Sequence, residues 1–337
     1  MPELPEAEQQ VLIALWEMQT REQVPDQAAL EQEGQAYFRR SKADWRGAVE
    51  RLAAQDALAV TQGAIHLSDH GKSIAQALHE AHPSIRYFYI DYYAAAPRSA
   101  ASAEFCRRVY GRDLCQHGYA DMGQLDRLID VAQIGAGSRV LDLGCGTGQI
   151  AEYISDITGA YVHGIDYIPA AIQVAQERTH AKRDRLSFSV GDIYKLDMPP
   201  RSFDMLIAID TLYFGDMQTV IGTLKHLLVA GGQMAIYYFT ILFDDTADRT
   251  TVQRDKTELA QALAQHRLPY RTWDFTQAEY ERAQTALQVL EDVKPLFEAE
   301  GNGFLYKNRM MESGGSIRFI DEGRASRYLY HVVLPGA

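Results

Sequence analysis

The stretch SRVLDLGCGTGQIAEYI, residues 138–154, decides the fold that the sequence predicts. Its apolar residues Val140, Leu141 and Leu143 are typical of a buried strand, and three glycines at alternate positions follow before a helical pattern begins. Glycine lets the backbone pass close to a ligand because it has no Cβ. The helix that opens after the turn directs unpaired backbone N–H groups toward the same place. The pattern therefore predicts a strand, a ligand-binding turn and a helix.

The rest of the chain from residue 138 repeats the alternation of apolar strands and helical stretches, which predicts an α/β sheet of seven strands with helices on both faces. A long helical stretch, roughly Gln277 to Glu312, precedes the last strand, and we expect that strand to be inserted antiparallel. The predicted strands are RVLDLG, YVHGID, LSFSVGD, FDMLIAID, QMAIYYF, YRTWDF and RYLYHVVL.

The composition excludes several classes of protein. The chain has 337 residues, 47% of them hydrophobic and 23% charged, which is ordinary for a globular protein with two domains. No apolar run approaches the roughly 20 residues that a bilayer crossing needs. Three widely spaced cysteines argue against a disulfide framework, and an acidic, polar N-terminus is unlike a secretory signal. These features predict a cytoplasmic protein that does not bind membranes.

Residues 1–84 carry the order of a winged-helix-like domain: three amphipathic helical stretches, two short apolar runs about a Gln-Gly turn, and a closing helix. Winged helices often bind DNA, but this segment has seven Lys and Arg against thirteen Asp and Glu. Because affinity for DNA comes largely from neutralising phosphates, a net formal charge of −6 opposes it. We expect no nucleic-acid partner and assign the domain to dimerisation or to covering the substrate.

These patterns divide the chain into three parts. We expect the winged-helix-like domain at 1–84, a helical linker and active-site cap at 85–130, and an α/β catalytic domain at 131–337 with an insertion at about 241–315.

The spacing of the glycines argues against a nicotinamide cofactor, because Gln149 stands where the dinucleotide fingerprint G-x-G-x-x-G has its third glycine. The segment LDLGCGTG instead resembles motif I of the class I S-adenosylmethionine-dependent methyltransferases. HGID, VGDIYKLDMPPRSFDMLIAID and LLVAGGQMAIYYF follow in the order of that family, so the resemblance covers roughly residues 115–240.

The resemblance implies S-adenosylmethionine as cofactor, S-adenosylhomocysteine as product, and a set of cofactor-binding residues. Asp166, at the end of the second strand, corresponds to the acid that binds both ribose hydroxyls, and Asp192 to an acid near the adenine. A carboxylate at the carboxyl end of a strand in an open α/β sheet is also physically well placed for a ribose. The alternative for each acid is a structural turn or helix cap. The expected cofactor-binding residues are Gln124, Asp142, Gly144, Gly146, Gly148, Asp166, Tyr167, Asp192 and Ile193.

Candidate catalytic residues come from segments that the family places around the methyl group. His117 is a candidate general base, although it also suits a helix N-terminus. Asp210 follows the fourth strand and is a candidate proton acceptor or amine ligand, or else an ordinary strand end. Tyr213 is a candidate for cation–π contact with the sulfonium. Expected substrate-binding residues are Tyr89, Tyr93, Tyr119, Tyr306 and Arg309, and Cys115 with His117 is too small a set for a metal site.

The aromatic segment YFYIDYY, residues 87–93, allows two interpretations: packing between domains, or the wall of the active site. Tyrosine outnumbers phenylalanine four to one there, and a buried tyrosine hydroxyl requires a polar partner.

The sequence thus predicts an enzyme that transfers a methyl group from S-adenosylmethionine to a nitrogen or oxygen of a small-molecule acceptor, in secondary metabolism and with a homodimer as a candidate assembly. An alternative is an enzyme that cyclises or cleaves S-adenosylmethionine without methyl transfer. A less favoured alternative is a DNA-binding regulator that responds to S-adenosylmethionine.

Overall fold

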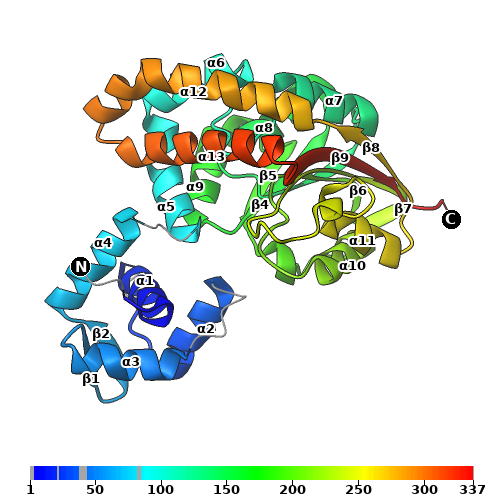
Figure 1. Cartoon of the computed structure of the whole chain (residues 1–337). Coiled ribbons are helices and arrows are strands. Elements are labelled where there is room, and N and C mark those ends of the chain that lie inside the picture. Colours follow the sequence, from blue (N-terminus) through cyan, green and yellow to red (C-terminus); the bar gives the residue numbers. More distant parts are fainter. Residues whose placement is uncertain (1–3, 21–22, 38–43, 82–84, 337) are drawn as a thin grey trace. The chain divides into compact units, whose positions relative to one another are not determined.

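The computed structural model describes residues 4–20, 23–37, 44–81 and 85–336, and the chain divides into two compact units, Met1–Asp91 and Tyr92–Ala337 (Figure 1). The division lies within helix α5 (Ile85–Ala95). The first unit contains, in order, α1 (Glu6–Thr20), α2 (Gln27–Tyr37), α3 (Trp45–Ala54), the hairpin β1 (Leu58–Thr61) and β2 (Ala64–Leu67), and α4 (Asp69–Ala81).

The first unit has its own core. Apolar residues of α1 such as Leu12 and Leu15 pack with Leu52 of α3, Ile65 of β2 and Leu78 of α4. The predicted order of helices, hairpin and closing helix is present. The turn at Gln62 and Gly63 has positive φ at both residues, 51° and 84°, as a two-residue hairpin requires. The name winged helix remains a prediction.

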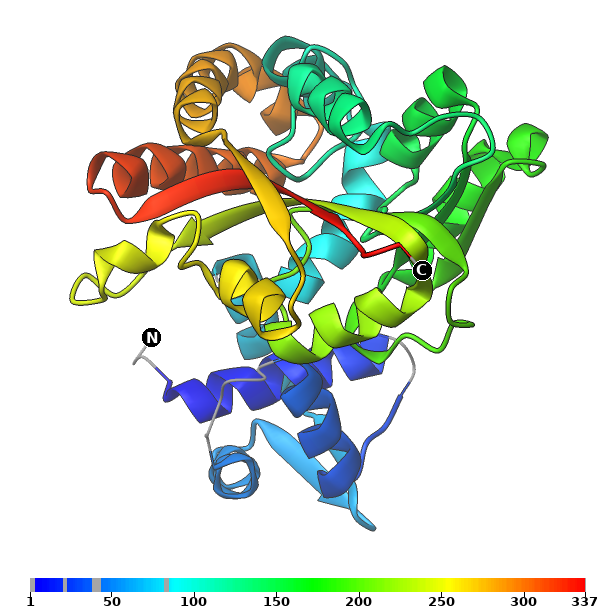
Figure 2. The same ribbon diagram turned by 90° about the vertical axis from the view of Figure 1, so that its right-hand side faces the viewer.

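The second unit is built on a seven-stranded sheet with the order β5-β4-β3-β6-β7-β9-β8. All pairs are parallel except those that β9 makes with β7 and β8, so the predicted antiparallel insertion of the last strand is confirmed. Figure 2 shows the long strands β7 and β9 side by side. The strands are β3 (Arg139–Leu143), β4 (Tyr161–Asp166), β5 (Leu186–Val190), β6 (Phe203–Ile209), β7 (Leu228–Ile241), β8 (Tyr270–Asp274) and β9 (Ala325–Val333).

Helices cover both faces of this sheet, as the sequence predicts, because successive strand residues point to opposite faces. Leu206 of β6 contributes to a core with α10 (Met217–Leu227) and α11 (Glu258–Gln265). Its neighbour Ile207 contributes to the opposite core, with α7 (Met122–Ala132), α8 (Gln149–Thr158) and α9 (Pro169–Arg178).

The expectation of one long helix from Gln277 to Glu312 is wrong. Two helices, α12 (Thr276–Ala299) and α13 (Gly303–Asp321), lie side by side (Figure 1). The chain reverses at Gly301, whose φ of 72° favours glycine. Next to it, Glu300 accepts hydrogen bonds from the Ser99 hydroxyl (2.5 Å) and the Ala101 N–H (3.0 Å), and so fixes the start of α6 (Ala100–Tyr110) against α12.

Candidate active site

The glycine-rich turn lies at the carboxyl end of β3, as predicted. Gly144, Gly146 and Gly148 have φ angles of 75°, 54° and 74°, in the left-handed region that side chains with a Cβ rarely adopt. The N–H groups of Gly144 and Cys145 donate to the Ile165 carbonyl at 2.8 and 2.9 Å. The turn is therefore fastened to the end of β4, with the N-terminus of α8 directly behind it.

Asp166, the last residue of β4, is the residue that holds the turn. Its Oδ2 accepts from the Gly146 N–H at 2.8 Å and its Oδ1 from the Ile168 N–H at 2.9 Å. Burial raises the pKa of this carboxyl, and the backbone N–H groups work in the opposite direction. Tyr167, which follows it, keeps 40% of its surface exposed.

Asp142 lies within the same turn region and has an uncompensated carboxylate oxygen. It is 3% exposed, and its Oδ2 has no hydrogen-bond partner. Burial, together with the negative charge of Asp166, raises the pKa of Asp142 to about 7.

Thr211 Oγ1 is a second buried polar atom without a hydrogen-bond partner. Its side chain closely approaches Gly144, where an added Cβ would lie 2.4 Å from Thr211 Cγ2. Such atoms suit a ligand that carries cationic or donor groups.

Tyr93 lies against the turn. A Cβ added to Gly146 would be 2.8 Å from the Tyr93 hydroxyl oxygen, so the glycine is required for this close approach. The Tyr93 ring meets the Tyr92 ring edge to face, with 5.3 Å between centroids, and the Tyr92 ring meets His117 in the same way at 4.9 Å. Tyr93, from the aromatic segment, thus supplies one wall of the turn region.

Asp192 and Ile193 follow the carboxyl end of β5. Asp192 Oδ1 accepts from the Tyr194 N–H at 2.9 Å and so begins a short 3₁₀ helix, Ile193–Lys195. Ile193 is half-buried and packs against the core beneath α10. Both residues therefore stand at the same edge of the sheet as the turn and Asp166, since β3, β4 and β5 are parallel.

Asp210 follows β6 but does not serve as a free base, which corrects that expectation. Its carboxylate is paired with both terminal nitrogens of Arg327, and Oδ2 lies 3.0 Å from Nη2. It also accepts from the Tyr119 N–H at 2.9 Å and the Tyr213 hydroxyl at 3.3 Å. Because four donors already occupy this buried carboxylate, it has no lone pair left for the proton of an acceptor.

Tyr213 is also part of this network rather than a residue that faces a ligand. Its hydroxyl donates to Asp210 and accepts from the Phe239 N–H at 2.9 Å, and burial raises its pKa well above the usual value. Gln124 is 2% exposed and its Oε1 accepts from Arg327 Nε at 3.2 Å. Both residues support the site through hydrogen bonds to buried neighbours.

Arg309 is likewise buried, at 4% exposure, and fixes the segment before α7. It donates to the carbonyls of Gln116 (2.6 Å) and His117 (2.9 Å) and to the hydroxyls of Tyr92 and Tyr110, both at 3.1 Å. Direct contact with an acceptor, as the sequence suggested, conflicts with this arrangement, because both terminal nitrogens are committed to protein oxygens.

His117 lies beside two polar residues of α13. Its Nε2 is 3.2 Å from Asn308 Oδ1 and 3.4 Å from Glu312 Oε1. Burial and the charge of Arg309 lower the pKa of His117 to about 3, so its imidazole is neutral at physiological pH. Burial raises the pKa of Glu312 to about 7. The side chains of His117 and Glu312 keep 12% and 19% of their surface exposed, so neither is completely closed off from solvent.

The remaining predicted substrate residues are placed differently. Tyr119 packs edge to face on Phe239 at 5.1 Å, and burial raises its pKa well above the usual value. Tyr306 packs on α12, against Phe297 at 6.3 Å and Lys294 at 5.8 Å. Tyr89 is half-buried and belongs to the first unit, so its part in the site stays a prediction.

Sequence reasoning did not single out Arg327 or Glu312. A charged residue inside the apolar run ASRYLYHVV was the available signal for Arg327, because an arginine that is fully buried in a strand requires a carboxylate partner. Glu312 offered no such signal, since acidic residues on a helix are common.

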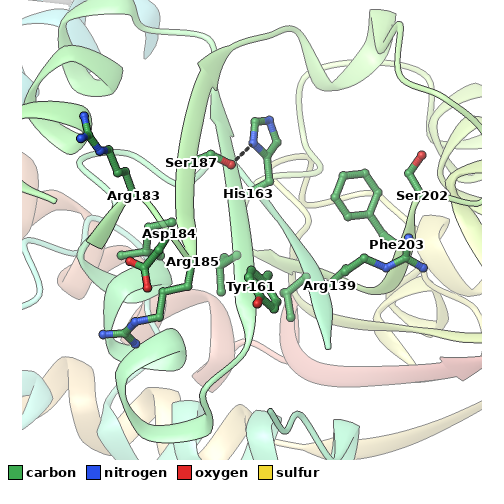
Figure 3. A pocket seen from close by; sticks show the side chains of 12 residues that line it. Arg139, Tyr161, His163, Arg183, Asp184, Arg185, Ser187, Ser202 and Phe203 are labelled. Atoms are coloured by element: carbon green, nitrogen blue, oxygen red, sulfur yellow. Dashed lines mark hydrogen bonds between the residues drawn. The ribbon is translucent and has the colours of Figure 1, made fainter. Parts of the chain in front are cut away.

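A separate open cavity of about 190 Å³ lies at the other end of the strands (Figure 3). Arg139 and Tyr161, at the starts of β3 and β4, line it, and so does His163, whose ring bonds Ser187. This cavity lies toward the amino ends of β3 and β4, whereas the glycine turn follows the carboxyl end of β3. Ligands of open α/β sheets bind beyond the carboxyl ends of the strands, so this cavity is not part of the candidate active site.

Two absences hold for the described residues. No helix among them combines the length and the apolar character that a bilayer crossing requires. Within residues 4–20, 23–37, 44–81 and 85–336, no three His, Cys, Asp or Glu side chains gather in a way that suits a metal ion.

The sheet order and the glycine turn are typical of a nucleotide-binding α/β domain, and the uncompensated carboxylate of Asp142 suits a ligand with a cationic group. Residues 134–299 match a family model described as a methyltransferase domain. Residues 134–299 are therefore similar to the methyltransferase domains that use S-adenosylmethionine as their cofactor. Asp142, Thr211 and the glycine turn fit that cofactor, which brings a sulfonium and an ammonium group.

Individual relatives agree with this assignment. The chain is 31% identical over 176 residues to a sterol 24-C-methyltransferase from Gibberella zeae, covering 49% of this chain and 44% of that one. It is 29% identical over 155 residues to the 27-O-demethylrifamycin SV methyltransferase of Amycolatopsis mediterranei, covering 42% and 57%. The chain thus spans about half the length of the curated relatives it matches.

A solved structure confirms the fold. Phosphoethanolamine N-methyltransferase 2 from Haemonchus contortus, in complex with phosphomonomethylethanolamine and S-adenosylhomocysteine, superimposes with a TM-score of 0.60 at 18% identity. The match covers 73% of this chain and 60% of that one.

The buried pair of Asp210 and Arg327 generates a prediction about stability. Asp210→Asn will lower the free energy of unfolding by about 3–5 kcal/mol, because it leaves the Arg327 guanidinium uncompensated in the interior. Urea denaturation measures the change. The control is Asp204→Asn in the exposed pair with Arg139, which will cost about 1 kcal/mol or less. Equal losses in the two variants would show that burial of the pair is unimportant.

The uncompensated carboxylate of Asp142 generates a second prediction. Since its pKa is raised when folded, the wild-type protein without cofactor loses stability as pH rises from about 4 to about 7. Asp142→Asn will therefore raise the free energy of unfolding at pH 8 without cofactor, yet weaken S-adenosylmethionine binding. Urea denaturation at pH 8, with and without S-adenosylmethionine, tests both effects.

The matched control for Asp142→Asn is Asp197→Asn, a substitution at an exposed carboxylate. It will change neither the free energy of unfolding at pH 8 nor the affinity for S-adenosylmethionine. If Asp142→Asn binds the cofactor as tightly as the wild type, the Asp142 carboxylate does not face the ligand.

Proposed function

We propose that this protein transfers a methyl group from S-adenosylmethionine to a nitrogen or oxygen of a small-molecule acceptor. The observation that carries the proposal is the buried, partnerless Oδ2 of Asp142 beside a glycine turn that Tyr93 covers. A carboxylate in that position costs stability unless a cation accompanies it. The cofactor, when bound, supplies an electrophilic methyl group on a sulfonium.

Other residues at the same sheet edge complete the proposed cofactor site. Asp166 receives the ribose hydroxyls while it continues to hold Gly146, and Tyr167 lies beside it. Asp192 and Ile193 bracket the adenine. Asp142 and Tyr93 serve the methionine end, and Gln124 supports the site from behind through Arg327. Most of these groups are already held by hydrogen bonds, so binding requires little reordering.

The proposed acceptor is small. The relatives are named for sterols and for 27-O-demethylrifamycin SV, and the solved neighbour holds phosphomonomethylethanolamine. The likeness to the rifamycin enzyme supports a place in secondary metabolism. The first unit is proposed to dimerise or to cover the substrate, and its acidic charge argues against nucleic acid. A cytoplasmic location stays a prediction.

Incubating the purified protein with S-adenosylmethionine alone distinguishes methyl transfer from cofactor cleavage or cyclisation. We expect neither S-adenosylhomocysteine nor methylthioadenosine to accumulate in proportion to enzyme until an acceptor is added. Liquid chromatography with mass spectrometry measures both products. Steady formation of methylthioadenosine without an acceptor would contradict the proposal and favour the alternative enzyme.

A mobility-shift assay across a salt series tests the DNA-binding alternative, which requires steeply salt-dependent binding.

The ribose assignment is tested at Asp166. Asp166→Ala will weaken S-adenosylmethionine binding by about 1–3 kcal/mol, because charge-assisted hydrogen bonds to the ribose are lost and the Gly146 N–H loses its acceptor. Isothermal calorimetry measures the affinity. Asp184→Ala, in the cavity at the opposite end of the strands, is the matched control and will leave it unchanged. Unchanged affinity in Asp166→Ala would remove Asp166 from the ribose site.

A further inference from the structure

The pair formed by Glu312 and His117 is not among the cofactor-binding residues proposed above, and it combines features of a proton acceptor. Glu312 Oε1 lies 3.4 Å from His117 Nε2, and Asn308 Oδ1 lies 3.2 Å from the same nitrogen. In the described part of the chain, Glu312 has no arginine or lysine within ion-pair distance, unlike the buried carboxylates of Asp210 and Glu279. It keeps 19% of its side chain exposed, so it is not completely closed off from solvent.

Two chains of contacts connect this pair with the glycine turn. His117 precedes Gly118, where an added Cβ would lie 2.9 Å from Asp210 Oδ2, and Asp210 precedes Thr211, which approaches Gly144. On the other side, the His117 ring meets Tyr92, and Tyr92 meets Tyr93 over Gly146. His117 is therefore linked through these residues to the glycine turn, and Glu312 is linked to it through His117.

The surrounding charges determine which kind of acceptor suits the pair. Glu279 neutralises Arg282 with two 2.8 Å hydrogen bonds, and Asp210 neutralises Arg327. Arg309 then remains as the one buried guanidinium of these three without a paired carboxylate, so the cluster is neutral only while Glu312 is ionised. A cationic ammonium group would bring additional positive charge close to Arg309, whereas a neutral hydroxyl would not.

We propose that Glu312 is the catalytic base of the methyl transfer and that the acceptor is a neutral molecule with an acidic hydroxyl group, a phenol or an enol. His117 is a positioning residue, since its Nε2 lies 3.4 Å from the Glu312 carboxylate and bonds Asn308 Oδ1 at 3.2 Å. This inference rests on the proposed function.

The step is balanced in atoms and charge. The O–H bond breaks and its proton goes to Glu312, an O–CH₃ bond forms as the S–CH₃ bond breaks, and the electron pair of the S–CH₃ bond stays on sulfur. A sulfonium and a carboxylate become a thioether and a carboxylic acid, so the buried site ends with less separated charge than it began with. A base is most effective when its pKa lies near the working pH, and burial has brought that of Glu312 to about 7.

The groups that face Glu312 come from all the elements packed around it. They are His117 and Tyr119 of the segment before α7, Tyr110 of α6, Glu279 and Arg282 of α12, and Asn308 and Arg309 of α13. The tyrosines have raised pKa values and the imidazole of His117 a lowered one, so Glu312 is the member of this set expected to titrate near neutral pH.

The experiment uses the full chain with S-adenosylmethionine that carries a CD₃ group. Phenols such as catechol and 4-nitrophenol, amines such as benzylamine and aniline, and a small-molecule cell extract are supplied in turn, and labelled products are identified by mass spectrometry. We expect CD₃ ethers. Products labelled only at nitrogen would overturn the inference but not the proposed function, whereas products labelled only at carbon would contradict both. A complete absence of labelled product would instead contradict the proposed function.

With the acceptor found, the wild-type kcat will rise with pH through about 7 and level off above it, because Glu312 must be ionised. Glu312→Gln will lower kcat at pH 8 by about 10²–10⁴-fold, flatten the pH profile and leave S-adenosylmethionine affinity unchanged. His117→Gln will lower kcat at pH 8 by a smaller factor than Glu312→Gln, and its kcat will still depend on pH. Glu291→Gln, an exposed carboxylate on α12, is the matched control and will match the wild type. An unchanged profile in Glu312→Gln would overturn the assignment.

A readout on the ligand-free protein is independent of turnover. Side-chain NMR of His117 will report a chemical-shift change near pH 7 in the wild type as Glu312 loses its proton. That change will vanish in Glu312→Gln, while thermal unfolding confirms that the variant is folded. Identical His117 titrations in the two proteins would show that the pair is not coupled and would overturn the inference.

Discussion

The buried ion pair between Arg327 and Asp210 is the interaction on which the rest of the site depends. β6 and β9 are not neighbours in the sheet, since β7 lies between them, and the pair connects them across Tyr237, whose ring lies 4.9 Å from the guanidinium carbon. The same carboxylate holds the Tyr119 N–H, and the same guanidinium holds Gln124. The end of the sheet and the segment before α7 are thus fixed by a single pair of charges.

This arrangement has an energetic consequence. Three arginines, Arg282, Arg309 and Arg327, are almost fully buried around the candidate site, and each requires full compensation because an unpaired buried charge is strongly destabilising. Glu279 and Asp210 compensate two of them directly, whereas Arg309 uses neutral oxygens of the backbone and of tyrosines. The networks hold the polar groups in fixed orientations, and preorganised dipoles of this kind favour reactions in which charge is created or removed.

The fold was largely predictable from the sequence, because its signals are local. The seven strands and the glycine turn at Gly144–Gly148 follow from apolar patterns and turn residues, and the antiparallel last strand was expected from the long helical stretch that precedes it. The break between α12 and α13 was missed, although the sequence Gly301-Asn302-Gly303 between the two helical stretches is a turn signal. The order of motifs along the chain predicted which residues gather at the glycine turn, and Asp166 and Gly146 meet there at 2.8 Å; their part in cofactor binding stays a prediction.

By itself, the sequence determined the class of sheet, the position of the ligand-binding turn and the acids beside it, because each depends on residues close together in the chain. It did not determine the roles of Asp210, Arg309 or Glu312. Asp210 and Arg327 are 117 residues apart, and His117 and Asn308 are 191 apart. Whether a carboxylate is paired, and with what, depends on which distant side chain burial brings beside it, and only the tertiary structure decided that.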